Sequence, residues 1–132
     1  MKQEEITKKV NKVYPLICAD YNSTALVDFH YNIYERLSGT KGMTGEVCAH
    51  AEYDWSANKI YIYTSRMKCE EDIIRSLIHE CVHSNQNKWL FDCYYDEGET
   101  YDTHPYEIEA RKAENSWYKY LKYLIKQKNI NK

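Results

Sequence analysis

The chain has 132 residues, the length of one ordinary domain, and we expect residues 1–132 to form a single domain. Hydrophobic residues make up 43% of the chain and charged residues 29%, which is typical of a globular protein in water. The 18 basic and 20 acidic residues give a net charge of -2, so we expect no nucleic acid partner. No apolar run approaches the roughly 18 residues that span a bilayer, so we expect no membrane association.

The cysteines and the N-terminal residues indicate a reducing compartment. The five cysteines are odd in number and widely spaced, without a Cys-x-x-Cys pair. We therefore expect free thiols rather than disulfides or a cysteine zinc cluster. The N-terminal segment, MKQEEITKKVNKV, lacks the apolar centre of a signal peptide. Both observations predict a cytoplasmic protein.

The N-terminal part of the chain predicts one helix and one strand. Apolar residues recur at helical spacing from Ile6 onward, and we expect Pro15 to end this helix near Tyr14. Apolar and polar residues then alternate over 25–33. This period of two predicts a half-buried strand.

A glycine-containing loop and a hairpin are expected next. The stretch SGTKGMTG, residues 38–45, predicts a loop rather than a linker between domains. Two further strands are predicted over 46–53 and 59–64, separated by the polar turn DWSANK. Their short separation favours a hairpin.

The period changes to a helical one from about Glu70. An apolar stripe runs through 73–82, and acidic residues occupy the first turn, where they complement the positive end of a helix. The segment 91–103 is acidic and without clear period, so we expect a loop there. Pro105 then stands where a proline suits the first turn of a final helix. The order of helix, three strands, helix, long loop and helix predicts an α+β fold.

The helix that begins near Glu70 contains the motif His79-Glu80-Cys81-Val82-His83, an HExxH. Residues four apart on a helix are separated by about 40° around its axis, so both imidazoles project from one face. Neutral imidazole is a good ligand for Zn²⁺. Zinc lowers the pKa of a bound water, and Glu80 can accept its proton as general base.

Two histidines do not complete a catalytic zinc site, which usually has three protein ligands and one open position. The longer metzincin motif is excluded, because Trp89 stands where its third histidine would be. The third ligand must therefore come from further along, and HPYEIEAR, residues 104–111, is the obvious source. Glu107 and Glu109 lie about 200° apart on a helix, so only one can face the HExxH helix. His104 is a third possibility.

The HExxH helix and the second helix that opens with HPYEIEAR resemble the small zincin-type metallopeptidases of the HExxH…E arrangement, found in bacteria and phages. The resemblance covers about 53–117. It implies a zincin-like fold with an N-terminal helix, a three-stranded sheet, the HExxH helix and a second, ligand-bearing C-terminal helix. It also implies a zinc cofactor and Glu109 as third ligand, because in such families this glutamate often directly precedes a small residue, here Ala110.

The resemblance implies a zinc metallopeptidase that hydrolyses peptide bonds in a peptide or protein substrate. We expect it to act in the cytoplasm, or in the host cytoplasm if a phage encodes it. One alternative is a zincin-fold protein that binds zinc for stability or presents an interaction surface, without catalysis. Another is a regulatory protease that acts on one partner, such as a repressor, as some similar HExxH…E proteins do.

Further polar residues are candidates for supporting roles. His104 and Tyr106 are candidate donors to the oxyanion that develops in the transition state, and Tyr101 is another. Gln86 lies on the ligand face of the HExxH helix and is a candidate partner for a ligand histidine. If the strand 59–64 borders the cleft, an extended peptide could add to it.

Overall fold

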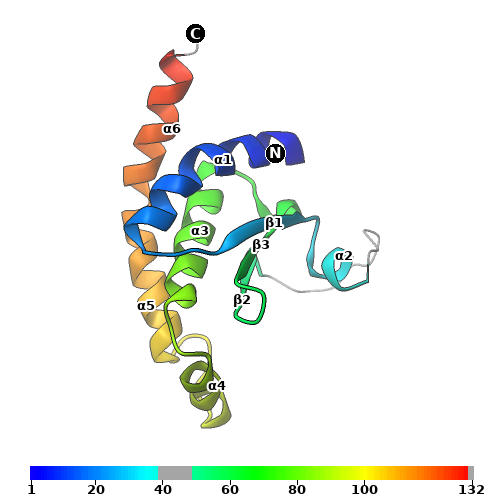
Figure 1. Ribbon diagram of the computed structural model, residues 1–132, viewed down its shortest axis with the longest axis vertical. Helices are drawn as coiled ribbons and strands as arrows, with labels where there is room; N and C mark the ends of the chain where they lie inside the picture. The colour runs from blue at the N-terminus through cyan, green and yellow to red at the C-terminus, as the bar shows by residue number, and fades with distance from the viewer. Residues whose placement is uncertain (39–48, 131–132) are drawn as a thin grey trace.

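The structure, a computed structural model, describes residues 1–38 and 49–130 (Figure 1). Helices and strands alternate in the first part of the chain, and helices make up the rest. The elements are α1 (Gln3–Asp20), β1 (Leu26–His30), α2 (Ile33–Ser38), β2 (Ala51–Asp54), β3 (Lys59–Tyr63), the 3-10 turn η1 (Thr64–Arg66), α3 (Glu70–Ser84), α4 (Lys88–Asp96), α5 (Pro105–Ala113), the 3-10 turn η2 (Glu114–Ser116) and α6 (Tyr118–Ile130). The predicted α+β class is confirmed.

The three strands form one small mixed sheet in the order β1-β3-β2. β1 is parallel to β3, and β2 is antiparallel to it, so the predicted hairpin of β2 and β3 is confirmed. The prediction that the strand 59–64 could lie at the edge beside the cleft is wrong, because β3 is the central strand. Residues 39–48, which include most of the predicted loop and the start of the predicted strand 46–53, lie outside the described residues.

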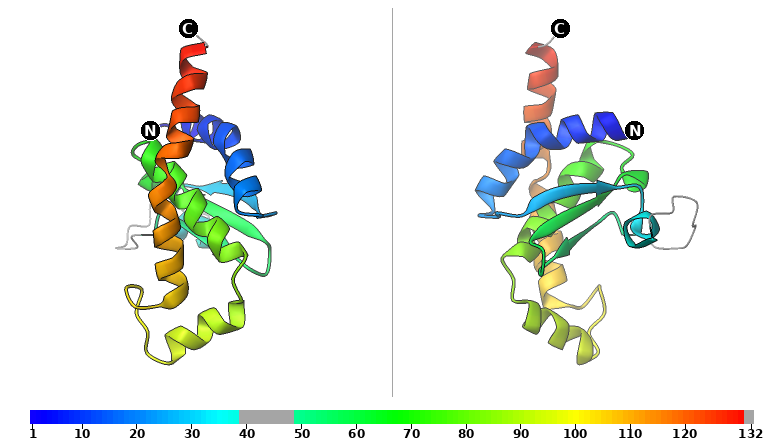
Figure 2. Two further views of the ribbon diagram at one scale, coloured as in Figure 1. Left: turned by 90° about the vertical axis from the view of Figure 1, so that its left-hand side faces the viewer. Right: turned by 45° about the vertical axis from the view of Figure 1, so that its right-hand side comes forward.

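The core lies between one face of the sheet and helices α1 and α3. Ile60 and Ile62 of β3 are fully buried on this face, together with Ile74 and Ile78 of α3. On its other side α3 contacts α5, η2 and α6. Figure 2 shows α3 between the sheet and the long C-terminal run of helix. A helix in this central position has one face in the core and another free to carry a site.

The predicted end of α1 near Tyr14 is wrong, because the helix continues through Pro15 to Asp20. A proline inside a helix removes one backbone hydrogen bond and costs about 3 kcal/mol. Pro15 is exposed, whereas Val13 and Ile17 on either side of it are buried. Burying Ile17 on the same face as the rest of the stripe offsets the cost of the proline.

Two other segments differ from their predictions. The alternating stretch 25–33 forms a shorter strand, and Asn32 then begins helix α2 by accepting a hydrogen bond from the N–H of Glu35 at 2.8 Å. The first part of the segment 91–103, which was predicted as a loop, belongs to helix α4. The N-cap of α4 is Asn87, whose side-chain oxygen accepts a hydrogen bond from the N–H of Leu90 at 3.0 Å. None of the residues of α4 is buried, but its sequence is amphipathic at helical spacing, so the periodicity was present and the prediction missed it.

Two expectations about the chain's chemistry can be compared with the structure. The cysteines in the described ranges are free: Cys18, Cys69, Cys81 and Cys93. Over 1–38 and 49–130, no helix combines the length and apolarity needed to cross a membrane.

Candidate metal centre

Helix α3 places the HExxH motif between the core and a cleft. Its carboxylates at positions 70–72 lie in the first turn, at the positive end of the helix dipole. Ile74 and Ile78 turn one side of the helix into the core. His79 and His83, one turn apart, project together from another side, as the helical spacing predicts.

Helix α5 supplies the carboxylate that faces these histidines. His104 is its N-cap, and the Nδ1 atom accepts hydrogen bonds from the N–H groups of Tyr106 (3.1 Å) and Glu107 (3.4 Å). A glutamate three residues after the N-cap often bonds back to the N-cap N–H. Here that N–H donates to the carbonyl of Thr100 at 2.8 Å. The Glu107 carboxylate is therefore left to extend toward α3.

His79, His83 and Glu107 form a buried cluster that could hold a metal ion. Each offers one ligand atom, and the three atoms lie within 4.8 Å of one another. Oε1 of Glu107 is 3.2 Å from Nε2 of His79 and 2.6 Å from Nε2 of His83. Ligands at roughly 2.0–2.1 Å from a tetrahedral zinc ion lie about 3.3 Å apart. A bound zinc ion would therefore require Oε1 of Glu107 and Nε2 of His83 to lie about 0.7 Å further apart.

Both imidazoles are oriented by hydrogen bonds at their other nitrogen. Nδ1 of His79 lies 2.7 Å from Oε2 of Glu114, and Nδ1 of His83 lies 2.6 Å from Oε1 of Gln86. These oxygens accept hydrogen bonds from the Nδ1–H groups, and each Nε2 is directed at Glu107. Such partners of metal-binding histidines fix the tautomer and the ring orientation. Gln86 therefore contacts a candidate ligand histidine, as its place on the helix predicted.

Sequence reasoning missed Glu114 as the partner of His79. A signal for it exists in the helical spacing, because Glu114 lies two turns after Glu107 and therefore on the same side of the helical run. Ala110 lies between them on that side and is fully buried against α3. A small residue there allows α3 and α5 to approach closely.

The electrostatics of the cluster suit a cation. Burial opposes charge on His79, but hydrogen bonds with Glu107 and Glu114 outweigh it and raise the pKa of His79 to about 10. Burial also opposes charge on Glu107, yet hydrogen bonds from His79 and His83 hold the pKa of this carboxyl well below its usual range. Without a metal, a proton on His79 supplies the positive charge that the surrounding carboxylates stabilise.

Glu80 lies next to the cluster and differs from the other carboxylates. It is 6% exposed and lines the cleft. Burial raises the pKa of Glu80, against the opposing effect of the nearby His79 and His83. Within the described ranges, no group donates a hydrogen bond to its carboxylate. A carboxylate at the wall of a cleft, with no hydrogen-bond donor among the described residues, is available to take a proton from a water molecule.

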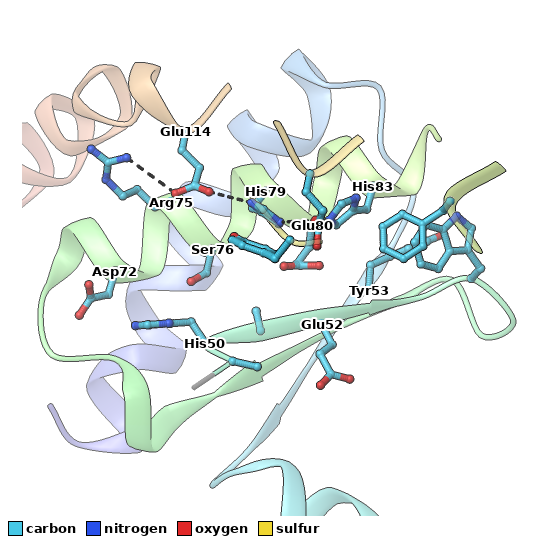
Figure 3. A pocket seen from close by; sticks show the side chains of 16 residues that line it. His50, Glu52, Tyr53, Asp72, Arg75, Ser76, His79, Glu80, His83 and Glu114 are labelled. Atoms are coloured by element: carbon cyan, nitrogen blue, oxygen red, sulfur yellow. Dashed lines mark hydrogen bonds and ion pairs between the residues drawn. The ribbon is translucent and has the colours of Figure 1, made fainter. Parts of the chain in front are cut away.

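The cleft has a volume of about 780 Å³ and runs between α3 and strand β2. Figure 3 shows His79, Glu80 and His83 side by side on α3, opposite the strand. One end is charged, with Asp72 and Arg75 among its lining residues. The motif thus stands at the middle of an open groove rather than in a closed cavity.

The other end of the cleft is aromatic. The ring of Trp55 lies 5.1 Å from that of Tyr53 and 4.9 Å from that of Phe91, measured between centroids. Phe91 meets the His83 ring edge to face at 5.3 Å. The indole N–H of Trp55 donates to the carbonyl of Gln86 at 3.2 Å. These contacts form a continuous apolar wall beside the metal-binding cluster.

The choice of Glu109 as third ligand is corrected by this geometry. Glu109 is exposed, whereas Glu107 is 6% exposed and lies against the two histidines. The expectation rested on the small residue that directly follows the glutamate. On a helix, neighbouring residues point about 100° apart, whereas residues three apart share a side. Ala110 therefore shares its buried side with Glu107.

The other candidates take different places. His104 is fully buried, and it neither belongs to the candidate metal-binding cluster nor lines the cleft. Its Nε2 atom instead contacts the carbonyl of Phe91 at 2.9 Å. Tyr106 packs on the ring of Tyr94 and does not line the cleft either. Tyr101 does line it, with its ring 6.4 Å from that of His79.

No family model, curated protein or solved structure matches this chain. The residues and their geometry therefore carry the functional argument. What they establish is a buried group of two histidines and one glutamate that could hold a metal ion.

Proposed function

We propose that this protein is a zinc-dependent metallopeptidase of the zincin type, which hydrolyses peptide bonds in the cleft between α3 and β2. One observation carries the proposal. The buried group of His79, His83 and Glu107 lies beside Glu80, a carboxylate without a hydrogen-bond donor in the described parts of the chain, and all four line an open cleft. A purely structural zinc site usually has four protein ligands and no such neighbour.

The ligand set supports zinc as the metal. Two imidazole nitrogens and one carboxylate are the ligands of several catalytic zinc sites, whereas Mg²⁺ and Ca²⁺ prefer oxygen ligands alone. Three protein ligands would leave a coordination position open for water or substrate, as in catalytic zinc sites. When bound, zinc would lower the pKa of a coordinated water and polarise a substrate carbonyl.

Glu80 is the proposed general base. Its carboxylate accepts a proton from the attacking water and later delivers that proton to the amine that leaves. A base works best when its pKa approaches the working pH, and burial moves the pKa of Glu80 in that direction. The absence of a competing donor among the described residues leaves both oxygens free for this exchange.

Strand β2 is the proposed binding site for the substrate backbone. Among the described residues, β2 has a neighbouring strand on one side only. The N–H of Tyr63 in β3 donates to the carbonyl of His50 at 3.0 Å. Along an antiparallel strand, successive residues direct their backbone N–H and C=O groups alternately toward and away from the neighbouring strand. His50 faces β3, so the backbone groups of Ala51 and Tyr53 point to the open edge. An extended peptide can add there as a further strand.

Tyr101 is the proposed donor to the developing oxyanion. It lines the cleft near His79, and Arg111 holds its segment by donating to the carbonyls of Tyr101 (2.6 Å) and Asp102 (3.0 Å). Burial raises the pKa of Tyr101, against an opposing effect of Arg111, so the hydroxyl keeps its proton at neutral pH. It can therefore donate a hydrogen bond.

A library of unstructured peptides tests the proposal, with cleavage read by mass spectrometry. The zinc-loaded protein should cleave members of the library, and a chelator or Glu80→Gln should abolish cleavage. Stoichiometric zinc binding without any cleavage would instead favour the alternative, a zinc-binding protein that acts as a structural or interaction module.

A further inference from the structure

We propose that His104 is a positioning residue that holds helix α4 against the metal centre and, through Tyr95, fixes the carboxylate of Glu107. The inference rests on the proposed function in one respect only, because it takes Glu107 to be a metal ligand. It gives a role to the most deeply buried histidine of the described residues, which neither lines the cleft nor belongs to the cluster.

The hydrogen bonds of His104 define its tautomer. Nδ1 accepts from the N–H groups of Tyr106 and Glu107, so it carries no proton. The carbonyl of Phe91, 2.9 Å from Nε2, can only accept. The neutral imidazole therefore carries its proton on Nε2 and donates it to α4, while Nδ1 caps α5. One rigid ring thus joins the two helices.

Helix α4 depends on this connection because it has few other buried contacts. None of its residues is buried. The side that faces the protein carries three aromatic rings, and all of them surround the His104 imidazole. Their centroids lie 4.4 Å (Tyr95), 4.6 Å (Phe91) and 5.2 Å (Tyr94) from that of His104. The imidazole is therefore both the hydrogen-bond donor and the packing centre for α4.

The position of α4 bears directly on the metal centre. The hydroxyl of Tyr95 donates to Oε2 of Glu107 at 2.9 Å, while Oε1 of the same carboxylate faces His79 and His83. Each oxygen of Glu107 therefore has its own partner, and the plane of the carboxylate is fixed. If α4 moves away, Oε2 loses its donor and the carboxylate can rotate away from the ligand geometry.

Asparagine at position 104 separates the two functions of the histidine. Asparagine is a good N-cap, so His104→Asn keeps the cap of α5. Its shorter side chain cannot also donate to the Phe91 carbonyl on the opposite side of the imidazole. The variant therefore tests the connection to α4 while α5 retains its start.

The experiment measures the Zn²⁺ affinity of the full chain by competition with a chromophoric chelator. Partners of metal ligands are typically worth 10- to 100-fold in affinity. We expect His104→Asn and Tyr95→Phe each to weaken zinc binding about 10-fold. Because both act through the same hydrogen bond to Glu107, the double variant should lose little more than either single one. His30→Asn, a histidine exchange on the sheet away from the cleft, should bind zinc like the wild type.

Hydrogen exchange of the metal-free proteins gives an independent measurement. In His104→Asn the amides of α4 should exchange faster, whereas those of α1 and α3 should keep their rates. Unchanged α4 exchange overturns the inference. A double variant that binds zinc about 100-fold more weakly than wild type would also overturn it, because the two losses of binding free energy would then be independent and additive. Failure of the wild type to bind zinc would refute the proposed function, and the exchange of α4 would still decide whether His104 holds this helix.

Discussion

Nδ1 of His79 and Oε2 of Glu114 are 2.7 Å apart, and this contact joins the HExxH helix to the turn η2. Arg75 lies on the other side of the same carboxylate, 3.7 Å from Oε1 of Glu114, and also contacts Glu71 at 2.7 Å. Glu114 therefore lies between the guanidinium of Arg75 and the imidazole of His79. A carboxylate that accepts from Nδ1 makes the opposite nitrogen of the imidazole a stronger metal ligand.

The contact predicts that Glu114→Ala weakens zinc binding about 10- to 100-fold without removing any metal ligand. Glu114→Gln should have a smaller effect, because the amide oxygen can still accept from Nδ1 but carries no charge. Zinc titrations of both variants measure this order. Glu97→Ala, at an exposed carboxylate, is the matched control. Equal affinity of Glu114→Ala and wild type would show that this carboxylate does not support the metal.

The third ligand can be tested with two variants of one helix. Glu107→Gln removes the carboxylate that faces His79 and His83, so zinc affinity should fall by more than 100-fold, beyond the usual effect of a supporting residue. Glu109→Gln changes an exposed side chain two residues away and should leave zinc affinity within about twofold of wild type, a shift below 0.5 kcal/mol. The opposite order would restore the assignment that the family resemblance favours.

Glu80→Gln separates catalysis from metal binding. The amide keeps nearly the same shape but cannot accept the proton of the attacking water, so hydrolysis should fall by roughly 10²- to 10⁴-fold. Zinc affinity should stay near the wild-type value, because Glu80 is not in the ligand cluster. Removing a buried charge should also leave the variant at least as stable as wild type. Full cleavage activity in this variant would contradict the proposed mechanism.

The parts of the fold that follow from local pattern could be predicted. The stripe of α3 and the alternation of its neighbouring strands are repeated signals, and the HExxH spacing places two imidazoles on one helical face whatever surrounds them. The short sequence of α4 is amphipathic, but its aromatic residues pack around one distant histidine, His104. Its position depends on contacts between separate segments, which no local pattern encodes.

The third ligand illustrates the same limit at the site. Helical geometry alone allows only one of Glu107 and Glu109 to face α3, but which side of α5 faces α3 depends on tertiary packing. The fully buried Ala110 marks that side in the structure. The placement of Glu107 and Glu114 beside the histidines then follows from their spacing. The family resemblance favoured Glu109 from the residue that follows it in the chain, whereas the buried group of the structure contains Glu107.

The charges of the metal-free site predict how its stability depends on pH. The pKa of His79 is raised from 6.5 to about 10, so its contribution is complete below pH 6.5 and is lost as the pH rises toward 10. The pKa of Glu107 is lowered from 4.5, so its contribution is complete above pH 4.5 and is lost at lower pH. The raised pKa of Glu80 also makes the folded state less stable as the pH rises. His79 and Glu107 together therefore favour the folded state most between pH 4.5 and 6.5.

The melting temperature of the metal-free protein, measured in chelator, should therefore fall by several degrees between pH 6.5 and 9. With zinc bound, Nε2 of His79 holds the ion rather than a proton, so the fall over this range should be much smaller. Glu107→Gln removes the main partner of the His79 proton and should flatten the decline in the metal-free protein. Circular dichroism melts at matched ionic strength provide the measurement. A melting temperature that rises from pH 6.5 to 9 in chelator would show that His79 is not held protonated by Glu107 and Glu114.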